Sequence, residues 1–255
     1  MLGSVFIGPH GRKLRALINT AFLLAALFAC GLCPAWADEC PPKRTMHVPD
    51  PMQPLNLDQI KNQLRAYHEQ NYNADITAVV SDAREWIEYR ANKVAKPALV
   101  LDIDETSLSN WPNLRANDLG FIADGSCERL PKGPCGFNAW VLRHRDKPIA
   151  PTHTLFDAAR AKGVSVFFIT GRHETQRRVT LLNLHGSGYR GWTKLIMRAD
   201  SDAKRTVQAY KTEARSKIAA QGFDIIANVG DQSSDLDGGY AECPFKLPNP
   251  FYLVR

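Results

Sequence analysis

The stretch of sequence that decides the fold reads Ala98-Leu99-Val100-Leu101-Asp102-Ile103-Asp104-Glu105-Thr106. Its first four residues are apolar, and such a run is typical of a strand that is buried on both faces of a parallel sheet. Because side chains alternate along a strand, Asp102 and Asp104 leave its carboxyl end on the same side. Ligands bind at that edge of open α/β sheets, so the pair predicts a binding site there. A solvated turn after the strand is the simpler alternative.

The chemistry of this acidic pair follows from its charge. Two neighbouring carboxylates repel each other, and a divalent cation with oxygen ligands would relieve that repulsion. One carboxylate could act as a nucleophile and the other as a general acid and base. The pair is therefore the first candidate catalytic site of the chain.

The N-terminal segment, residues 1–37, has the three parts of a secretory signal peptide. Three basic residues precede a mostly apolar run over residues 16–32, and a small-x-small sequence ends at Ala37. We therefore expect cleavage after Ala37 and export. The apolar run is short for a membrane span, so no stable span is expected after cleavage, and an uncleaved anchor is the alternative. Lipidation at Cys30 ranks lower, because Phe28 fits a lipobox poorly.

Removal of this segment leaves residues 38–255, a length that suits one α/β domain with a sizeable core. The segment carries three basic residues and no acidic one, so its removal lowers the net charge from +6 to +3. No run of lysine and arginine with interleaved aromatic residues is present, so a nucleic-acid partner is not expected. We expect small-molecule partners, and a homo-oligomer is left open.

The cysteines indicate an oxidising compartment. Four of them remain after removal of the signal segment: Cys40, Cys127, Cys135 and Cys243. An even number in an exported chain indicates two disulfides, with three possible pairings. Cys127 and Cys135 bracket a loop rich in proline and glycine and are expected to pair, which leaves Cys40 with Cys243. Free buried thiols are the alternative, and a zinc site is not expected.

Two segments flank the first strand. Apolar residues at helical spacing over residues 57–92 predict a helical arm that covers the sheet. Residues 107–150 hold too few periodic apolar positions for a core of their own, so we expect a small cap insertion over the carboxyl edge of the sheet. Its aromatic residues, Trp111, Phe137 and Trp140, could stack on a substrate ring. Packing within the cap is the favoured interpretation for Phe137 and Trp140.

A second buried strand, residues 164–169, runs into Thr170, Gly171 and Arg172, and a helix is expected to begin at His173. The threonine hydroxyl, open backbone N–H groups and a helix N-terminus would together make an anion site. Arg172 could add a bidentate clamp on a phosphate, or it could pair with an acid.

A third apolar strand, residues 223–229, is followed by Asp231 and Asp235. The helix predicted before it, residues 203–220, carries three candidate ammonium groups: Lys204, Lys211 and Lys217. Three strands in βα repeats thus each end in polar groups, and in a parallel sheet all three meet at one edge. Carboxylates with a hydroxyl, an arginine and a lysine form a site for a metal-bridged phosphate. The absence of a Walker-type loop disfavours a nucleotide-hydrolysing motor.

Taken together, these motifs resemble those of an acid phosphatase of the haloacid dehalogenase (HAD) superfamily. The most similar group, subfamily IIIB, includes class B and class C bacterial acid phosphatases and plant vegetative storage proteins. The resemblance covers most of residues 38–255, and four motifs in the right order make it specific. It implies an α/β, Rossmann-like HAD fold with a central parallel sheet, an N-terminal helical arm and a small cap insertion, in which residues 38–255 form one HAD-like phosphatase domain.

The resemblance also implies catalytic roles. Asp102 would be the nucleophile and form an aspartyl-phosphate, and Asp104 would protonate the leaving oxygen and then activate water. Thr170 would hydrogen-bond the phosphoryl group, and Lys211 matches the family lysine better than the two other lysines. Thr106 would orient the Asp104 loop.

The implied cofactor is Mg²⁺. The residues expected at the metal are Asp102, Asp104 through its backbone carbonyl, Asp231, and Asp235 through a metal-bound water or the lysine. The residues expected to bind phosphate and substrate are Thr106, Gly171, Arg172 and Trp111. Stacking of Trp111 on a nucleobase is left open, because the family often places a tyrosine a few residues after Asn110.

The resulting expectation is an exported, Mg²⁺-dependent acid phosphatase that hydrolyses phosphate monoesters, either non-specific or inclined to nucleoside monophosphates. A non-catalytic storage or ligand-binding relative is the alternative, and phosphotransfer to an alcohol is a third hypothesis. Because a general acid must be protonated when the leaving group departs, the highest activity is expected at mildly acidic pH. Retention in a periplasm and release from the cell are both left open.

Overall fold

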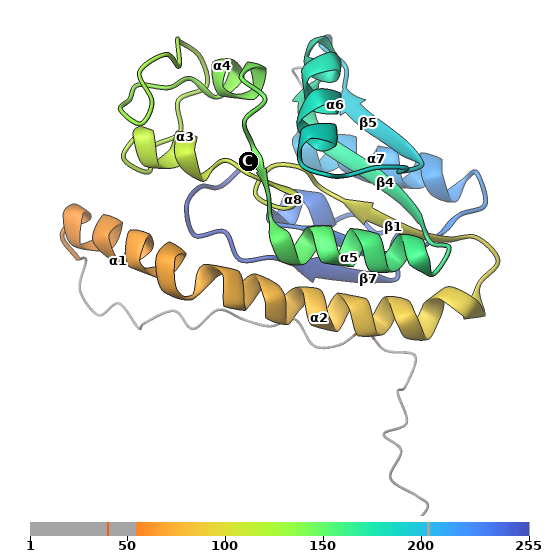
Figure 1. Ribbon diagram of the computed structural model, residues 1–255. Helices are drawn as coiled ribbons and strands as arrows, with labels where there is room; N and C mark the ends of the chain where they lie inside the picture. Colours follow the sequence, from red (N-terminus) through yellow and green to blue (C-terminus); the bar gives the residue numbers. More distant parts are fainter. Residues whose placement is uncertain (1–39, 41–54, 203–204, 255) are drawn as a thin grey trace, which may run out of the picture. The chain divides into compact units, whose positions relative to one another are not determined.

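The structure, a computed structural model, describes Cys40, residues 55–202 and residues 205–254. The predicted signal segment and Lys204 lie outside the described residues. A five-stranded parallel sheet in the order β5-β4-β1-β6-β7 organises this part of the chain (Figure 1). Its strands are β1 (Pro97–Leu101), β4 (Ser165–His173), β5 (Lys194–Arg198), β6 (Asp224–Gly230) and β7 (Cys243–Lys246). The three strands expected from apolar runs are β1, β4 and β6, which lie side by side at the centre of the sheet.

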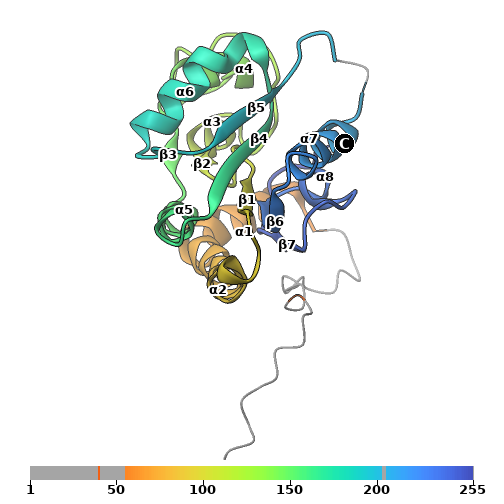
Figure 2. The ribbon, with the colours of Figure 1, turned by 90° about the vertical axis from the view of Figure 1, so that its right-hand side faces the viewer.

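Helices cover both faces of this sheet (Figure 2). They are α1 (Leu57–Gln70), α2 (Tyr72–Arg90), α3 (Trp111–Ala116), α4 (Phe137–Leu142), α5 (Ala150–Ala161), α6 (Arg177–Gly186), α7 (Val207–Ala219) and α8 (Ser233–Leu236), with 3-10 turns at Ala91–Lys93 and Glu174–Gln176. The alternation of β1 side chains explains the two layers. Leu99 and Leu101 pack in one cluster with apolar residues of α2 and α5, whereas Ala98 and Val100 pack in another with residues of α7.

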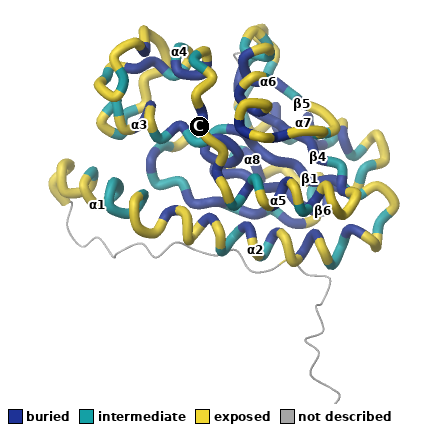
Figure 3. The backbone as a smooth tube through the Cα atoms, in the orientation of Figure 1, coloured by how far each residue is buried: buried dark blue, intermediate teal, exposed yellow. Residues whose placement is uncertain are grey.

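The helices α1 and α2 lie within the predicted arm but are buried to different degrees. Figure 3 shows buried residues along α2, and α1 has none. Asn56 caps α1 by accepting a hydrogen bond from the backbone N–H of Asp58 (2.9 Å). Farther along α1, Lys61 and Arg65 form ion pairs with Asp118 of the segment that follows α3. The arm thus covers the sheet through α2, while α1 reaches the insertion.

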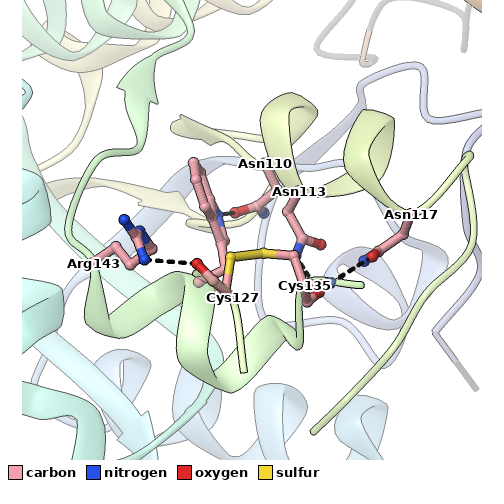
Figure 4. The surroundings of a disulfide bond; sticks show 7 residues. Asn110, Asn113, Asn117, Cys127, Cys135 and Arg143 are labelled. Carbon is pink, nitrogen blue, oxygen red and sulfur yellow. Dashed lines mark hydrogen bonds between the residues drawn. A yellow bond between two sulfur atoms is a disulfide. The ribbon is translucent and has the colours of Figure 1, made fainter. Parts of the chain in front are cut away.

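The insertion between β1 and α5 contains α3, α4 and a short antiparallel ribbon of β2 (Leu108–Ser109) and β3 (Lys147–Pro148). Its core is the disulfide between Cys127 and Cys135, with Trp140 packed against it. Figure 4 shows hydrogen bonds around this disulfide, among them those of Asn117 and Arg143. Trp140 Nε1 donates to the side-chain oxygen of Asn110 (2.9 Å). Trp140 therefore packs inside the insertion, as the sequence favoured.

One predicted boundary is wrong. The helix expected from His173 does not begin there, because β4 continues to His173 and pairs with Arg198 after a shift in register. A 3-10 turn follows, and α6 begins at Arg177. The anion site was expected to include the N-terminus of a helix directly after Arg172, and the structure does not provide it.

The second disulfide joins Cys40 to Cys243, the first residue of β7, so the structure has both expected pairings. The strand β7 was not predicted, because its sequence, Cys-Pro-Phe-Lys, is short and lacks an apolar run. Within the described residues, no helix is both long enough and apolar enough to cross a membrane.

Candidate active site

The polar ends of the three central strands meet at the carboxyl edge of the sheet, as the sequence predicted. Asp102 and Asp104 follow β1, Arg172 lies at the end of β4, and Asp231 follows β6. They line a cavity of about 230 Å³ together with Lys211 of α7 and Asp235 of α8. Parallel strands bring these segments together because their carboxyl ends share one edge.

Lys211 bridges two carboxylates at the floor of this cavity. Its Nζ atom donates to Oδ1 of Asp102 and to Oδ1 of Asp235, each at 2.5 Å, and all three side chains are buried. Burial alone would lower the pKa of Lys211, but the two carboxylates outweigh it and raise that pKa, so the ammonium group stays charged. Of the two candidate lysines within the described residues, Lys211 is therefore the one that the structure brings to Asp102. Lys217 pairs with Glu213 and is exposed.

A cluster of three buried carboxylates surrounds this lysine. Ligand atoms of Asp102, Asp231 and Asp235 all lie within 4.8 Å of one another. Burial, with repulsion from the neighbouring carboxylates, raises the pKa of Asp102 despite Lys211, and it raises the pKa of Asp231 to about 6. One ammonium group cannot neutralise three carboxylates. Hard oxygen donors with surplus negative charge are the set that divalent cations such as Mg²⁺ prefer, so these residues fit such an ion.

Asp231 is held by neutral donors. Thr106 Oγ1 donates to Oδ1 of Asp231 (3.1 Å), while the side-chain amides of Gln232 and Asn249 each donate to Oδ2 (2.6 Å). Three of the acceptor positions of this carboxylate are thereby used, which fixes its orientation and leaves room for one more ligand. Thr106 thus anchors the loop after β1 to Asp231, and it does not line the cavity.

The carboxylate of Asp104 is bound by arginine and stands apart from the three-carboxylate cluster. Arg172 donates through Nε to both of its oxygens (3.2 and 3.0 Å) and through Nη2 to Oδ1 (2.7 Å). Asn110 adds a hydrogen bond at 3.0 Å. Burial works to raise the pKa of Asp104, but the guanidinium outweighs it and lowers that pKa. Of the two roles left open for Arg172, the structure thus has the pairing with an acid.

The remaining residues of this strand end are Thr170 and Gly171. Thr170 is buried, and its Oγ1 accepts a hydrogen bond from the backbone N–H of Arg172 (3.1 Å). Gly171 lines the cavity, whereas Thr170 does not. Gly171, Arg172 and His173 at the end of β4 therefore form part of the cavity wall.

Comparison with known proteins shows the family to which this chain belongs. A family model described as HAD superfamily, subfamily IIIB (Acid phosphatase) matches residues 40–255. The chain belongs to this subfamily. It is 33% identical over 185 residues to Acid phosphatase 1 of Solanum lycopersicum, a match that covers 72% of this chain and 69% of the tomato protein. It is 27% identical over 208 residues to Vegetative storage protein 1 of Arabidopsis thaliana, covering 78% of this chain and 74% of that protein.

A solved structure shares the fold of this subfamily IIIB protein. The class C acid phosphatase from Bacillus anthracis superposes with a TM-score of 0.60 at 23% sequence identity, covering 76% of this chain and 86% of the bacterial one. The expected α/β, HAD-type fold with a central parallel sheet is thereby confirmed.

The aromatic residues at the cavity of this subfamily IIIB protein differ from those expected. Trp111 stacks on His68 of α1 with ring centroids 3.6 Å apart and planes 6° apart, and it is not among the residues that line the cavity. Phe121 and Phe137 of the insertion line the cavity instead, with Tyr252 from the C-terminal segment. Phe121 and Tyr252 lie in irregular segments without apolar periodicity, so the sequence carried no signal for them.

Glu105 is a further residue that sequence reasoning missed. It is buried, and its carboxylate accepts hydrogen bonds from the hydroxyl of Tyr72 in α2 (2.9 Å) and from the backbone N–H of Asn110. Burial raises its pKa to about 7. Its φ of 55° lies in the left-handed region, which turns the chain sharply after Asp104. Glu105 therefore ties the loop that carries both aspartates to the helical arm.

Proposed function

We propose that this protein is an exported, Mg²⁺-dependent acid phosphatase that hydrolyses phosphate monoesters through an aspartyl-phosphate on Asp102. The observation that carries the proposal is the buried bridge from Asp102 through Lys211 to Asp235 at the floor of the cavity. A lysine between the two carboxylates holds a nucleophile in place and supplies positive charge where a phosphate would arrive. Membership in the acid phosphatase subfamily supports the same reaction.

In the first step, an Asp102 oxygen forms a bond to phosphorus while the bond from phosphorus to the leaving oxygen breaks. Asp104 gives a proton to that oxygen, so the leaving group departs as a neutral alcohol. Lys211 stays protonated and offsets the charge on the phosphoryl oxygens. The buried nitrogen Nη1 of Arg172 has no hydrogen-bond partner among the described residues and can serve a substrate oxygen, which supports a second role for this arginine.

In the second step, Asp104 takes a proton from a water molecule, and the water oxygen attacks phosphorus. The bond between phosphorus and Asp102 then breaks, which restores the carboxylate and releases inorganic phosphate. The same intermediate would serve transfer to an alcohol, because an alcohol can replace water in this step.

The metal would be held by Asp102 and Asp231, with Asp235 and the backbone carbonyl of Asp104 as supporting groups. A bound Mg²⁺ would neutralise the phosphate charge that otherwise repels the Asp102 carboxylate. We propose the substrate-binding face to be the aromatic wall of Phe121, Phe137 and Tyr252. An aromatic wall suits aryl phosphates and nucleoside monophosphates, because either offers a ring to stack.

The test is phosphate release by purified protein from an aryl phosphate and a panel of nucleoside monophosphates, with Mg²⁺ and with EDTA. We expect metal-dependent release that is lost in Asp102→Asn and kept in Asp237→Asn, an exposed carboxylate just after α8 that serves as the matched control. Added glycerol distinguishes hydrolysis from phosphotransfer through the products. A wild-type protein that is inactive with Mg²⁺ across the acid range would leave a storage or ligand-binding function, as in the vegetative storage proteins.

A further inference from the structure

A buried carboxylate outside the family motifs lies next to the candidate acid. Asp146 sits between α4 and β3, where the insertion returns to the main sheet, and its side chain is completely buried. Its Oδ2 accepts a hydrogen bond from Nη2 of Arg172 at 3.0 Å. The same nitrogen donates to Oδ1 of Asp104 at 2.7 Å. One guanidinium nitrogen thus joins Asp146 to Asp104.

Asp146 is itself fixed from the main domain. The side-chain amide of Asn183 in α6 donates to its Oδ2 at 2.6 Å, and Ser187 Oγ donates to its backbone carbonyl at 2.9 Å. Its position therefore does not depend on Arg172. A carboxylate that is anchored elsewhere can hold the guanidinium, whereas a carboxylate held only by the guanidinium could not.

This arrangement repeats the one at the nucleophile. Lys211 bridges Asp102 and Asp235, and Arg172 bridges Asp104 and Asp146. In each pair, one carboxylate stands at a proposed reacting position and the other contacts the cation from another side; Asp235 also lines the cavity, whereas Asp146 does not. Because the guanidinium is planar, a second carboxylate that also accepts from Nη2 helps to set the plane that the guanidinium presents to Asp104.

We propose that Asp146 is a positioning residue for leaving-group protonation: it holds Arg172 in the plane that orients the Asp104 carboxylate. This inference rests on the proposed phosphatase function. Loss of the Asp146 charge would let the guanidinium rotate about its remaining contacts, and Asp104 would then present its proton at a poorer angle. A substrate whose leaving group needs a proton suffers from this, and one whose leaving group is stable as an anion does not.

The experiment compares kcat/KM for two substrates, an alkyl phosphate and a nitrophenyl phosphate, in wild type and Asp146→Asn. It is done above pH 6, the approximate pKa of Asp146, so that this carboxylate is charged in the wild type. The kcat/KM value reports the steps up to departure of the leaving group, so slow hydrolysis of the common intermediate does not mask the effect. We expect kcat/KM for the alkyl phosphate to fall by about 10-fold or more, the usual size for removal of a supporting group. The value for the nitrophenyl phosphate should change little.

Three further variants separate positioning from simple loss of structure. Asn183→Ala removes the side-chain anchor of Asp146 but leaves its pair with Arg172, so it should shift the ratio of the two kcat/KM values in the same direction as Asp146→Asn, by a smaller factor. Asp146→Glu retains the charge on a longer side chain and should give an intermediate ratio; it also serves if Asp146→Asn fails to fold. In an Arg172→Gln background, the Asp146 change should have no further effect on the ratio.

The outcomes are distinct. A folded Asp146 variant with the wild-type ratio, or with equal losses on both substrates, overturns the inference and leaves Asp146 as an anchor of the insertion. A wild-type protein without activity on either substrate refutes the proposed function instead.

Discussion

The buried position of Asp146 makes a prediction about how stability depends on pH. Burial, which outweighs the attraction of Arg172, raises the pKa of Asp146 from 3.8 to about 6 in the folded protein. The folded state therefore binds the proton more tightly than the unfolded chain. The contribution of Asp146 to the free energy of unfolding is therefore greatest below pH 4, and this contribution is lost as the pH rises through about 6. A shift of this size corresponds to about 3 kcal/mol, since one pKa unit is about 1.4 kcal/mol.

The assay is urea denaturation of wild type and Asp146→Asn between pH 4.5 and 7.5, in EDTA. The asparagine variant has no proton to exchange at this position, and the other buried carboxylates titrate in both proteins and cancel in the difference. We expect the free energy of unfolding of wild type, relative to the variant, to fall by about 2 to 3 kcal/mol over this range. Glu85→Gln, an exposed change on α2, should give a curve parallel to that of wild type. A difference between wild type and Asp146→Asn that stays constant, or that grows with pH, would refute the reasoning.

Three further predictions concern the metal, the lysine and the disulfides. Mg²⁺ at about 100 times its dissociation constant should raise the free energy of unfolding by about 2.7 kcal/mol over the EDTA value, measured by thermal denaturation, and an unchanged melting temperature would exclude a site in the carboxylate cluster. In EDTA, Lys211→Met should lower the free energy of unfolding by about 3 to 5 kcal/mol, because it leaves buried carboxylates unpaired; a loss under 1 kcal/mol in urea titrations would contradict the buried bridge. The Cys40–Cys243 disulfide joins residues 203 positions apart, and Cys127–Cys135 joins residues 8 positions apart. Replacing both cysteines by serine should lower the free energy of unfolding by up to about 5 kcal/mol for the first disulfide and by about 2.5 kcal/mol for the second. A larger loss for the second would contradict the loop-entropy account.

The sequence predicted the parts of this site that depend on strand ends. Apolar runs identified β1, β4 and β6, and the geometry of parallel strands then placed Asp102, Asp104 and Asp231 at one edge. These inferences work because each needs only a local pattern and a general rule about sheets. The Cys127–Cys135 pairing could also be predicted, since a short loop between two cysteines leaves few alternatives in a chain with a predicted signal segment.

The sequence did not predict the contacts between segments that lie far apart along the chain. Trp111 was expected at the substrate, but His68, 43 positions earlier, stacks on its ring. The helix after Arg172 was placed too early, because pairing with β5 keeps the chain extended to His173. Asp146 carried no local signal, since a lone acid in a loop is usually solvated, and only the fold brings it to Arg172.

The two cations explain how neighbouring carboxylates coexist at this edge. Asp102 and Asp104 lie two residues apart, yet each faces a different cation: Lys211 holds the first and Arg172 the second. Asp231 receives hydrogen bonds from neutral donors only, so its negative charge is the one that Lys211 does not offset. A divalent cation is therefore needed near Asp102 and Asp231, and not near Asp104. On the other side, Arg172 lowers the pKa of Asp104, so this side chain alone does not account for the mildly acidic optimum that the sequence led us to expect. For Asp104 to protonate a leaving group, some of its hydrogen bonds to the guanidinium must break when substrate binds. The hydrogen bonds that remain would keep its carboxylate in the plane that Asp146 sets through Arg172.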